Sequence, residues 1–141
     1  MRIQDITNAA NLTKLALRGT FSLKTWDGET FNVAMISLHK CPWGSLETLS
    51  KKVLDFLFQM LLRGSNVVGY TNYPDNLVHK FCKHASRSGV DIFRVFDSLN
   101  YTENLKLGIG AAGSACEFVE STLYYMGRVS YPNKVNYDLE Y

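Results

Sequence analysis

Hydrophobic residues along this chain follow two spacings, one typical of β-strands and one typical of α-helices. Short runs of apolar or alternating residues predict four strands, at residues 21–25, 57–62, 92–96 and 122–129. Between them, apolar residues recur every three to four positions and predict helices, at residues 3–17, 31–38, 45–56, 76–88 and roughly 104–119. Strands and helices that alternate through short connections form parallel βαβ units. The pattern therefore predicts an α/β fold, either part of a barrel or a small doubly wound sheet.

Two polar residues directly follow predicted strands and are candidates for a functional site. The run 57–62 is continuously apolar, as expected of a strand buried on both faces of a parallel sheet, and Arg63 follows it. Asp97 follows the run 92–96 and is a catalytic candidate by this position alone. The glycine-rich segment 108–113 lies inside a predicted helix, so it does not match the phosphate-binding loop that joins a strand to a helix in dinucleotide-binding folds.

Composition narrows the class of protein. The 141 residues and 46% hydrophobic content fit one globular domain. Fifteen basic and thirteen acidic residues are scattered along the chain, which gives no footprint for nucleic acid. The apolar runs are shorter than the roughly 20 residues that span a bilayer. Three widely spaced cysteines indicate neither a disulfide framework nor a zinc site, and they favour a reduced, intracellular setting.

Two long segments resemble the carboxyltransferase domain of the pyruvate carboxylase family. These are FQMLLRGSNVVGYTNYPDN at residues 58–76 and DIFRVFDSLNY at residues 91–101. Shorter segments resemble the same domain in the same order, namely WDGETFNVAM, CPWGSLETL, AAGSA and YDLEY. The resemblance implies a (β/α)8 barrel of the HMG-CoA lyase type. That domain moves a carboxyl group from carboxybiotin to pyruvate and gives oxaloacetate, the anaplerotic and gluconeogenic step of an ATP-dependent ligase.

The resemblance also implies what the chain holds and what it lacks. A full barrel needs about 250 residues, so we expect residues 1–141 to be a partial TIM barrel, roughly its second to fifth strands with their helices. The ligands of the family's divalent metal, Zn or Mn, would lie outside the chain, as would the biotin carboxylase and biotinyl carrier domains. We therefore expect the isolated chain to be inactive.

In the complete enzyme, the resemblance implies biotin as cofactor, with pyruvate and a carboxybiotin carrier domain as partners. It further implies a homo-oligomer, located in the mitochondrial matrix of an animal or in the cytoplasm of a bacterium. No nucleic-acid or membrane partner is expected.

Three residues of this chain match pocket positions of the family. Arg63 matches an arginine that helps to hold an anionic substrate or the ureido oxygen of biotin, and its planar guanidinium suits a carboxylate. Tyr70 matches a tyrosine whose hydroxyl lies near biotin. Asn32 stands where the family has an aspartate of the same pocket, which removes a charge partner of Arg63.

Other departures from the family also fall in loops or at strand ends. Asp27 replaces a glycine, Arg128 replaces an aspartate, and Cys116 with Glu117 replaces a pair of glycines. The apolar runs are kept, whereas these loop positions, where function usually resides, have changed. An alternative function is therefore that of a truncated or decayed, non-catalytic fragment that only associates with other carboxylase chains.

Overall fold

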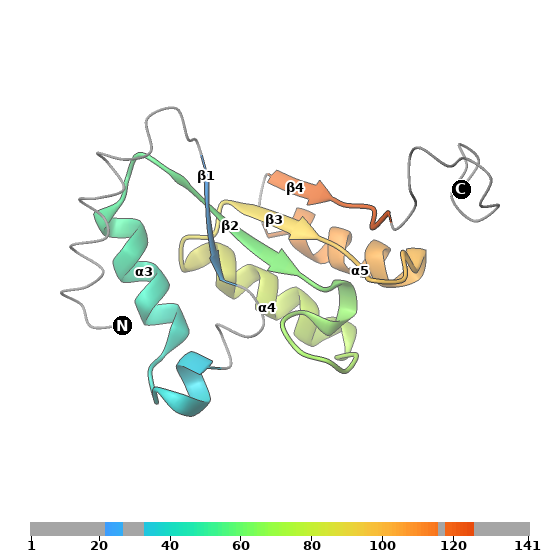
Figure 1. Ribbon diagram of the computed structural model, residues 1–141, viewed down its shortest axis with the longest axis horizontal. Coiled ribbons are helices and arrows are strands. Elements are labelled where there is room, and N and C mark those ends of the chain that lie inside the picture. Colours follow the sequence, from blue (N-terminus) through green and yellow to red (C-terminus); the bar gives the residue numbers. More distant parts are fainter. Residues whose placement is uncertain (1–21, 27–32, 116–117, 126–141) are drawn as a thin grey trace.

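The computed structural model describes residues 22–26, 33–115 and 118–125. In this part of the chain, four parallel strands form one sheet in the order β1-β2-β3-β4 (Figure 1). The strands are β1 (Ser22–Trp26), β2 (Leu57–Leu62), β3 (Ile92–Val95) and β4 (Phe118–Ser121). The helices are η1 (Val33–Ser37), α3 (Pro42–Lys52), η2 (Gly64–Asn66), α4 (Asp75–Arg87) and α5 (Thr102–Gly113).

Each strand pairs with the strand that follows it along the chain, without a reversal of order. A doubly wound sheet reverses its strand order at a switch point, whereas a barrel adds its strands in sequence. The α/β prediction is confirmed, and the strand order is that of an arc of a barrel.

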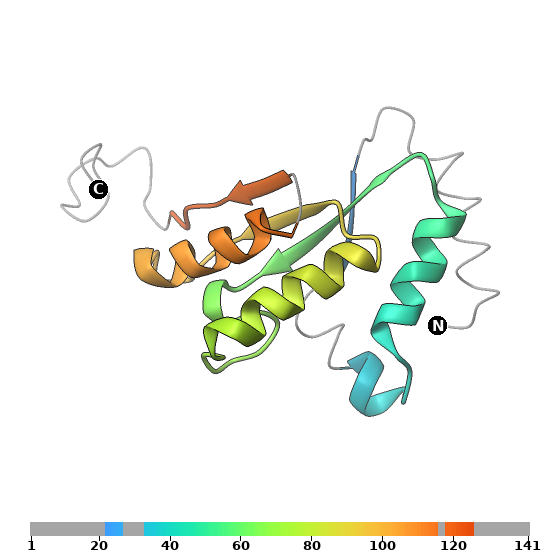
Figure 2. The same ribbon diagram turned by 180° about the vertical axis from the view of Figure 1, so that it is seen from behind.

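Helices α4 and α5 cover the same face of the sheet (Figure 2). Their apolar sides meet the side chains that β2 and β3 turn towards them, and together these form the main core. The fully buried members from these four elements are Met60, Leu62, Val78, Cys82, Ala85, Phe93, Val95, Ala111 and Ala112. The opposite face of β2 is more open. Gln59 on this face is buried, but Leu57 is 37% exposed. The prediction that residues 57–62 are buried on both faces is therefore wrong at Leu57.

The last strand lies earlier than predicted, at 118–121 rather than 122–129. Val119 pairs with Phe93 of β3, so a residue assigned to the preceding helix belongs to the sheet, and α5 already ends at Gly113. After β4 the backbone is held by the last residue of β3 and by the loop that follows it. Thr122 donates its N–H to Val95 O at 2.9 Å, and Tyr124 donates its N–H to Asn100 Oδ1 at 2.8 Å. Residues 126–129 lie outside the described residues.

Helix α3 begins at Pro42, three residues before the predicted start. Proline suits the first turn of a helix, because its missing N–H would have no partner there. The helix ends at Lys52, four residues before the predicted end at residue 56, and Leu54 beyond it is 80% exposed. Leu77 in α4 is also exposed, at 42%. The helix predicted at residues 3–17 lies outside the described residues.

Candidate functional site

The carboxyl ends of β2 and β3 lie level with each other. Leu62 pairs with Val95, and the next residue, Phe96, donates its N–H to Leu62 O at 3.0 Å. Arg63 and Asp97 therefore lie at the start of neighbouring loops, one and two residues after the strand ends, at the same edge of the sheet. This is the edge at which parallel α/β folds place their ligand sites.

The loop after β2 is a tight, internally bonded turn. Arg63 donates its N–H to Val67 O at 2.8 Å, and Asn66 donates its N–H to Arg63 O at 2.8 Å. Gly69 donates its N–H to Asn66 O at 2.7 Å, which continues the turn. Val67 has a φ of 55°, a left-handed conformation that costs a β-branched residue free energy. These bonds hold the backbone so that Tyr70 comes back beside Arg63.

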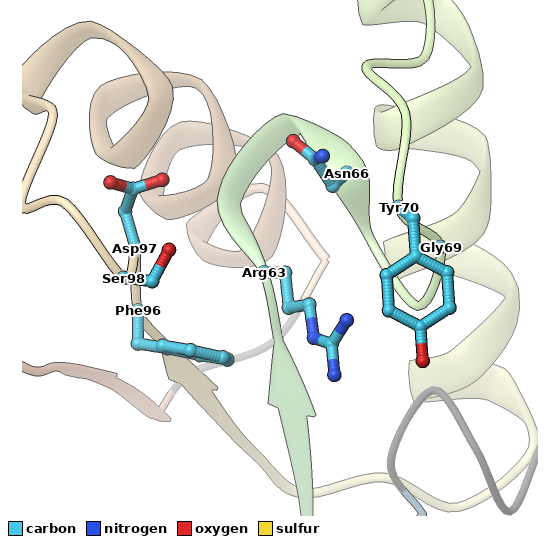
Figure 3. Close-up of a pocket in the computed structure, with 7 residues that line it drawn as sticks. All are labelled: Arg63, Asn66, Gly69, Tyr70, Phe96, Asp97 and Ser98. Carbon is cyan, nitrogen blue, oxygen red and sulfur yellow. The ribbon is translucent and has the colours of Figure 1, made fainter.

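A pocket of about 350 Å³ opens between the two loops (Figure 3). Its lining residues are Arg63, Asn66, Gly69, Tyr70, Phe96, Asp97 and Ser98. The guanidinium carbon of Arg63 lies 4.9 Å from the centre of the Tyr70 ring, within the range of a cation–π contact. Tyr70 is 70% exposed, and Arg63 is half-buried. Among the described residues, no carboxylate forms an ion pair with Arg63.

The structure brings three of the four predicted site residues to one pocket. Arg63, Tyr70 and Asp97 all line it. In Figure 3 the Asp97 carboxylate lies on the far side of Arg63 from Tyr70 and points away from the guanidinium. The fourth residue, Asn32, lies outside the described residues. The same is true of the other departures from the family, at Asp27, Cys116–Glu117 and Arg128.

Asp97 uses both carboxylate oxygens within the protein. Its Oδ2 accepts the N–H groups of Leu99 and Tyr101, each at 2.9 Å, and its Oδ1 accepts Nδ2 of Asn104 at 2.9 Å. Partial burial pushes the pKa of Asp97 upward. The hydrogen bonds from Tyr101, Asn104 and Leu99 outweigh that effect and hold the pKa below its ordinary value. At neutral pH Asp97 is therefore a carboxylate, and each of its two oxygens already accepts a hydrogen bond.

Asn104 and Ser65 were not found by sequence reasoning. Asn104 lies in the first turn of α5, and its Oδ1 accepts the Ser65 N–H at 3.1 Å and also the Ser65 hydroxyl. Ser65 itself is 6% exposed. An asparagine near a helix start has many ordinary uses, so no sequence signal distinguishes this one.

The donor set of the described residues does not fit a divalent metal. No group of three or more His, Cys, Asp or Glu side chains gathers there in a way that could hold a metal ion. The single carboxylate of the pocket, Asp97, is already committed to three donors.

No helix in the described residues is long and apolar enough to cross a membrane.

Comparison with known proteins gives a consistent result. No protein-family model matches the chain. All 141 residues align with pyruvate carboxylases, at 52% identity to the mitochondrial protein of Homo sapiens, 48% to that of Rattus norvegicus and 44% to the protein of Bacillus subtilis. The chain spans 12% of the length of each of these relatives.

Solved structures agree with the sequence matches. The carboxyl transferase domain of Rhizobium etli pyruvate carboxylase, determined with pyruvate, superposes with a TM-score of 0.89 and 41% identity. The match covers 99% of this chain and 24% of that one. The same domain determined with pyruvate and biocytin matches equally well, with a TM-score of 0.89. The arc of parallel strands described above thus corresponds to part of that carboxyl transferase domain.

Proposed function

Because this chain is a homologue of part of the carboxyltransferase domain of pyruvate carboxylases, we propose that it supplies one side of a pocket in which a carboxyl group passes from carboxybiotin to pyruvate. The product would be oxaloacetate. The observation that carries the proposal is the placement of Arg63 and Tyr70 together, at the carboxyl end of β2 and on one pocket.

The chemistry of Arg63 suits such a ligand. A guanidinium offers five N–H donors in a planar fork, which can hold a carboxylate through two parallel hydrogen bonds. The Tyr70 ring limits the orientations of that fork, because the cation–π contact favours one face of the guanidinium. The side chain is therefore partly organised for an anion, and less conformational entropy is lost on binding.

Each group has a separate part in this proposal. Arg63 binds the pyruvate carboxylate or the ureido oxygen of biotin and stabilises negative charge there. Tyr70 covers the ligand and presents its hydroxyl at the rim of the pocket. Biotin, when bound, would deliver the carboxyl group. The metal of the family reaction would need ligands that the described residues do not provide, so none of these roles depends on it.

The further context of the reaction is part of the same proposal. We expect the complete protein to be a homo-oligomer that works with a biotinyl carrier domain. Its compartment would be the mitochondrial matrix in an animal and the cytoplasm in a bacterium.

Ligand binding to the 141-residue chain tests the proposal. Oxamate, an unreactive analogue of pyruvate, and free biotin would be titrated separately and followed by NMR. Arg63→Ala removes the charged donors and should weaken oxamate binding by about 10- to 100-fold, since hydrogen bonds to a charged group contribute roughly 1.5–3 kcal/mol. Arg87→Ala is the matched control, because Arg87 is exposed at the end of α4 and should leave the affinity unchanged.

Two results would decide against the proposal. A folded chain that binds neither probe, or an Arg63→Ala variant that binds as well as the parent, would favour the non-catalytic fragment. An assay for oxaloacetate formation by the chain alone should show no turnover. Turnover with bound metal would mean that residues other than those named here carry the reaction.

A further inference from the structure

We propose that Asp97, Asn104 and Ser65 form a hydrogen-bonded relay that positions the Arg63 loop, so that Asp97 is a positioning residue and not a proton carrier. The inference rests on the proposed function for its ligand, but the relay itself can be measured without one. It assigns a role to Asp97, which lines the pocket, and to Asn104 and Ser65, which are not among its lining residues.

The relay joins three separate segments of the chain. Asn104 in α5 accepts two donors of Ser65, the backbone N–H at 3.1 Å and the side-chain hydroxyl. On its other side, Asn104 donates Nδ2 to Asp97 Oδ1 at 2.9 Å. The loop after β2, the loop after β3 and the first turn of α5 are thereby locked to one another.

Ser65 transmits this constraint to Arg63. The two residues lie two positions apart in a turn that is closed by the Arg63 N–H to Val67 O bond of 2.8 Å. Ser65 O also accepts the Tyr73 N–H at 3.1 Å, which anchors the far side of the same loop. A shift of Ser65 therefore moves both the Arg63 backbone and the segment that carries Tyr70.

The loop after β2 packs closely against α5 at Gly64, next to the relay. A Cβ on Gly64 would lie 2.8 Å from the backbone oxygen of Asn104. Gly64 has a φ of 47°, a conformation that glycine adopts without strain. The loop thus sits directly against α5, beside the Asn104 side chain that bridges the two.

Because each hydrogen bond of the relay has a defined donor and acceptor, the relay can be tested by swapping the residues at positions 97 and 104. Asp97 only accepts hydrogen bonds, whereas Asn104 accepts from Ser65 and donates to Asp97. With asparagine at 97 and aspartate at 104, all of these groups would again find partners. Either single exchange fails, because Asp97→Asn places two amide donors together and Asn104→Asp places two carboxylates together.

The experiment compares Asp97→Asn, Asn104→Asp and the double exchange in the 141-residue chain. Oxamate is the probe, and its dissociation constant is measured by NMR titration. Each single variant should bind at least about tenfold more weakly, and the double variant should return to within about threefold of the parent, because the partly buried polar groups all have partners again. Asn76→Asp, at an exposed position of α4, is the matched control and should not change binding.

Hydrogen exchange of the Ser65 amide is the second readout, and it needs no ligand. In both single variants this amide proton should exchange with solvent faster, and in the double variant (Asp97→Asn with Asn104→Asp) its protection should be restored. If the parent fails to bind oxamate but the amide follows this pattern, the proposed function is wrong and the relay stands. If a single variant does not fold, recovery of folding and of Ser65 protection in the double exchange supports the relay equally.

Three outcomes would overturn the relay. One is a folded single variant with parental binding and parental Ser65 protection. Another is a double exchange that stays as defective as the single variants. The third is loss of binding in both variants that lack Asp97 while Ser65 stays protected, which would make the Asp97 charge itself the contributing group.

Discussion

Two glycines determine how closely α5 approaches the Arg63 loop. A Cβ built on Gly108 would lie 2.9 Å from Gly64 Cα and 2.9 Å from Val95 Cγ1. The first of these neighbours is backbone and cannot turn aside. By contrast, a Cβ on Gly110, two residues along the same helix, would meet nothing within 4 Å.

The pair gives a matched test of packing. Gly108→Ala should lower the free energy of unfolding by about 1–3 kcal/mol, because it overpacks a backbone contact. Gly110→Ala should raise it by up to about 1 kcal/mol, since alanine favours a helix more than glycine does. Urea unfolding followed by circular dichroism measures both changes. Equal effects of the two substitutions would show that helix propensity, and not the contact with Gly64, controls this position.

Some residues of the candidate site could be predicted from the sequence, and others could not. Arg63 and Asp97 could be found because each directly follows an apolar run, and strand ends are where parallel folds carry polar groups. Tyr70 was identified through the family motif. Asn104 could not be found, because its part depends on the distance between two loops that are joined only in three dimensions. Its bonds to Ser65 and Asp97 leave no trace in local spacing.

At the scale of elements, an aromatic side chain of α3, Trp43, packs against α4, beside the fully buried Leu46 of the same helix. Trp43 meets the Phe81 ring edge-on at 5.2 Å and stacks on His84 at 4.7 Å. Both partners belong to α4. Aromatic pairs of this kind contribute beyond the area that they bury.

Trp43→Ala should therefore loosen α3. We expect a loss of about 2–4 kcal/mol in the free energy of unfolding, slightly below the range for fully buried aromatic residues because Trp43 is only partly buried. Leu54→Ala is the control and should change stability by less than about 0.5 kcal/mol, since Leu54 is 80% exposed. Chemical denaturation measures the totals, and amide exchange within α3 locates the effect. Unchanged protection of α3 amides would contradict this attachment.

A second contact joins β3 to β4 through side chains. Arg94 donates Nε and Nη2 to the two Glu120 oxygens at 2.8 and 2.9 Å. Gln59 of β2 donates Nε2 to Glu120 Oε2 at 2.6 Å. The hydrogen bond from Arg94 lowers the pKa of Glu120, partial burial raises it, and the charge of Arg94 with the Gln59 bond adds to the lowering, so the net pKa is below its ordinary value.

This pair predicts a pH dependence with a defined sign. A carboxylate with a lowered pKa stabilises the fold above the pKa of a free glutamate, about 4.3, and that contribution is lost as the pH falls through the lower folded value. Glu120→Gln should cost less than about 1 kcal/mol at pH 7, because both side chains are more than 40% exposed and water screens them. The difference from the parent should shrink in acid and in high salt. Thermal unfolding of the parent and the variant at pH 7 and in acid tests this prediction. A stability difference that is the same under both conditions would exclude the charge of Glu120 as its source.

Element boundaries were predicted well where burial dominates and poorly where tertiary pairing decides. The run 57–62 is β2 to the residue, because its apolar side chains fit the centre of a parallel sheet. The last strand was misplaced, because the tyrosines at 124 and 125 read as strand although they are exposed and lie beyond the sheet. Val119 pairs with Phe93 instead, so the position of the last strand is set by its register with β3.

At the scale of the whole molecule, the alternation of strands and helices was enough to predict the fold class. It could not distinguish an arc of a barrel from a doubly wound sheet, since both alternate in the same way. The order β1-β2-β3-β4 makes that distinction. The function could not be predicted from the alternation at all, because one fold carries many activities and only the site residues separate them.

The sequential order of the strands also affects how this chain reaches its structure. Each described strand finds its partner after a single intervening segment, so no pairing waits for the distant end of the chain. The entropy of closing each loop is correspondingly small. The segment from β2 through α4 to β3, with its connecting loops, contains most of the main buried core and can form first, after which β1 and β4 add to a template already in place. Opening of the native sheet should run in reverse, from the outer strands inward, as locally cooperative units of unequal stability.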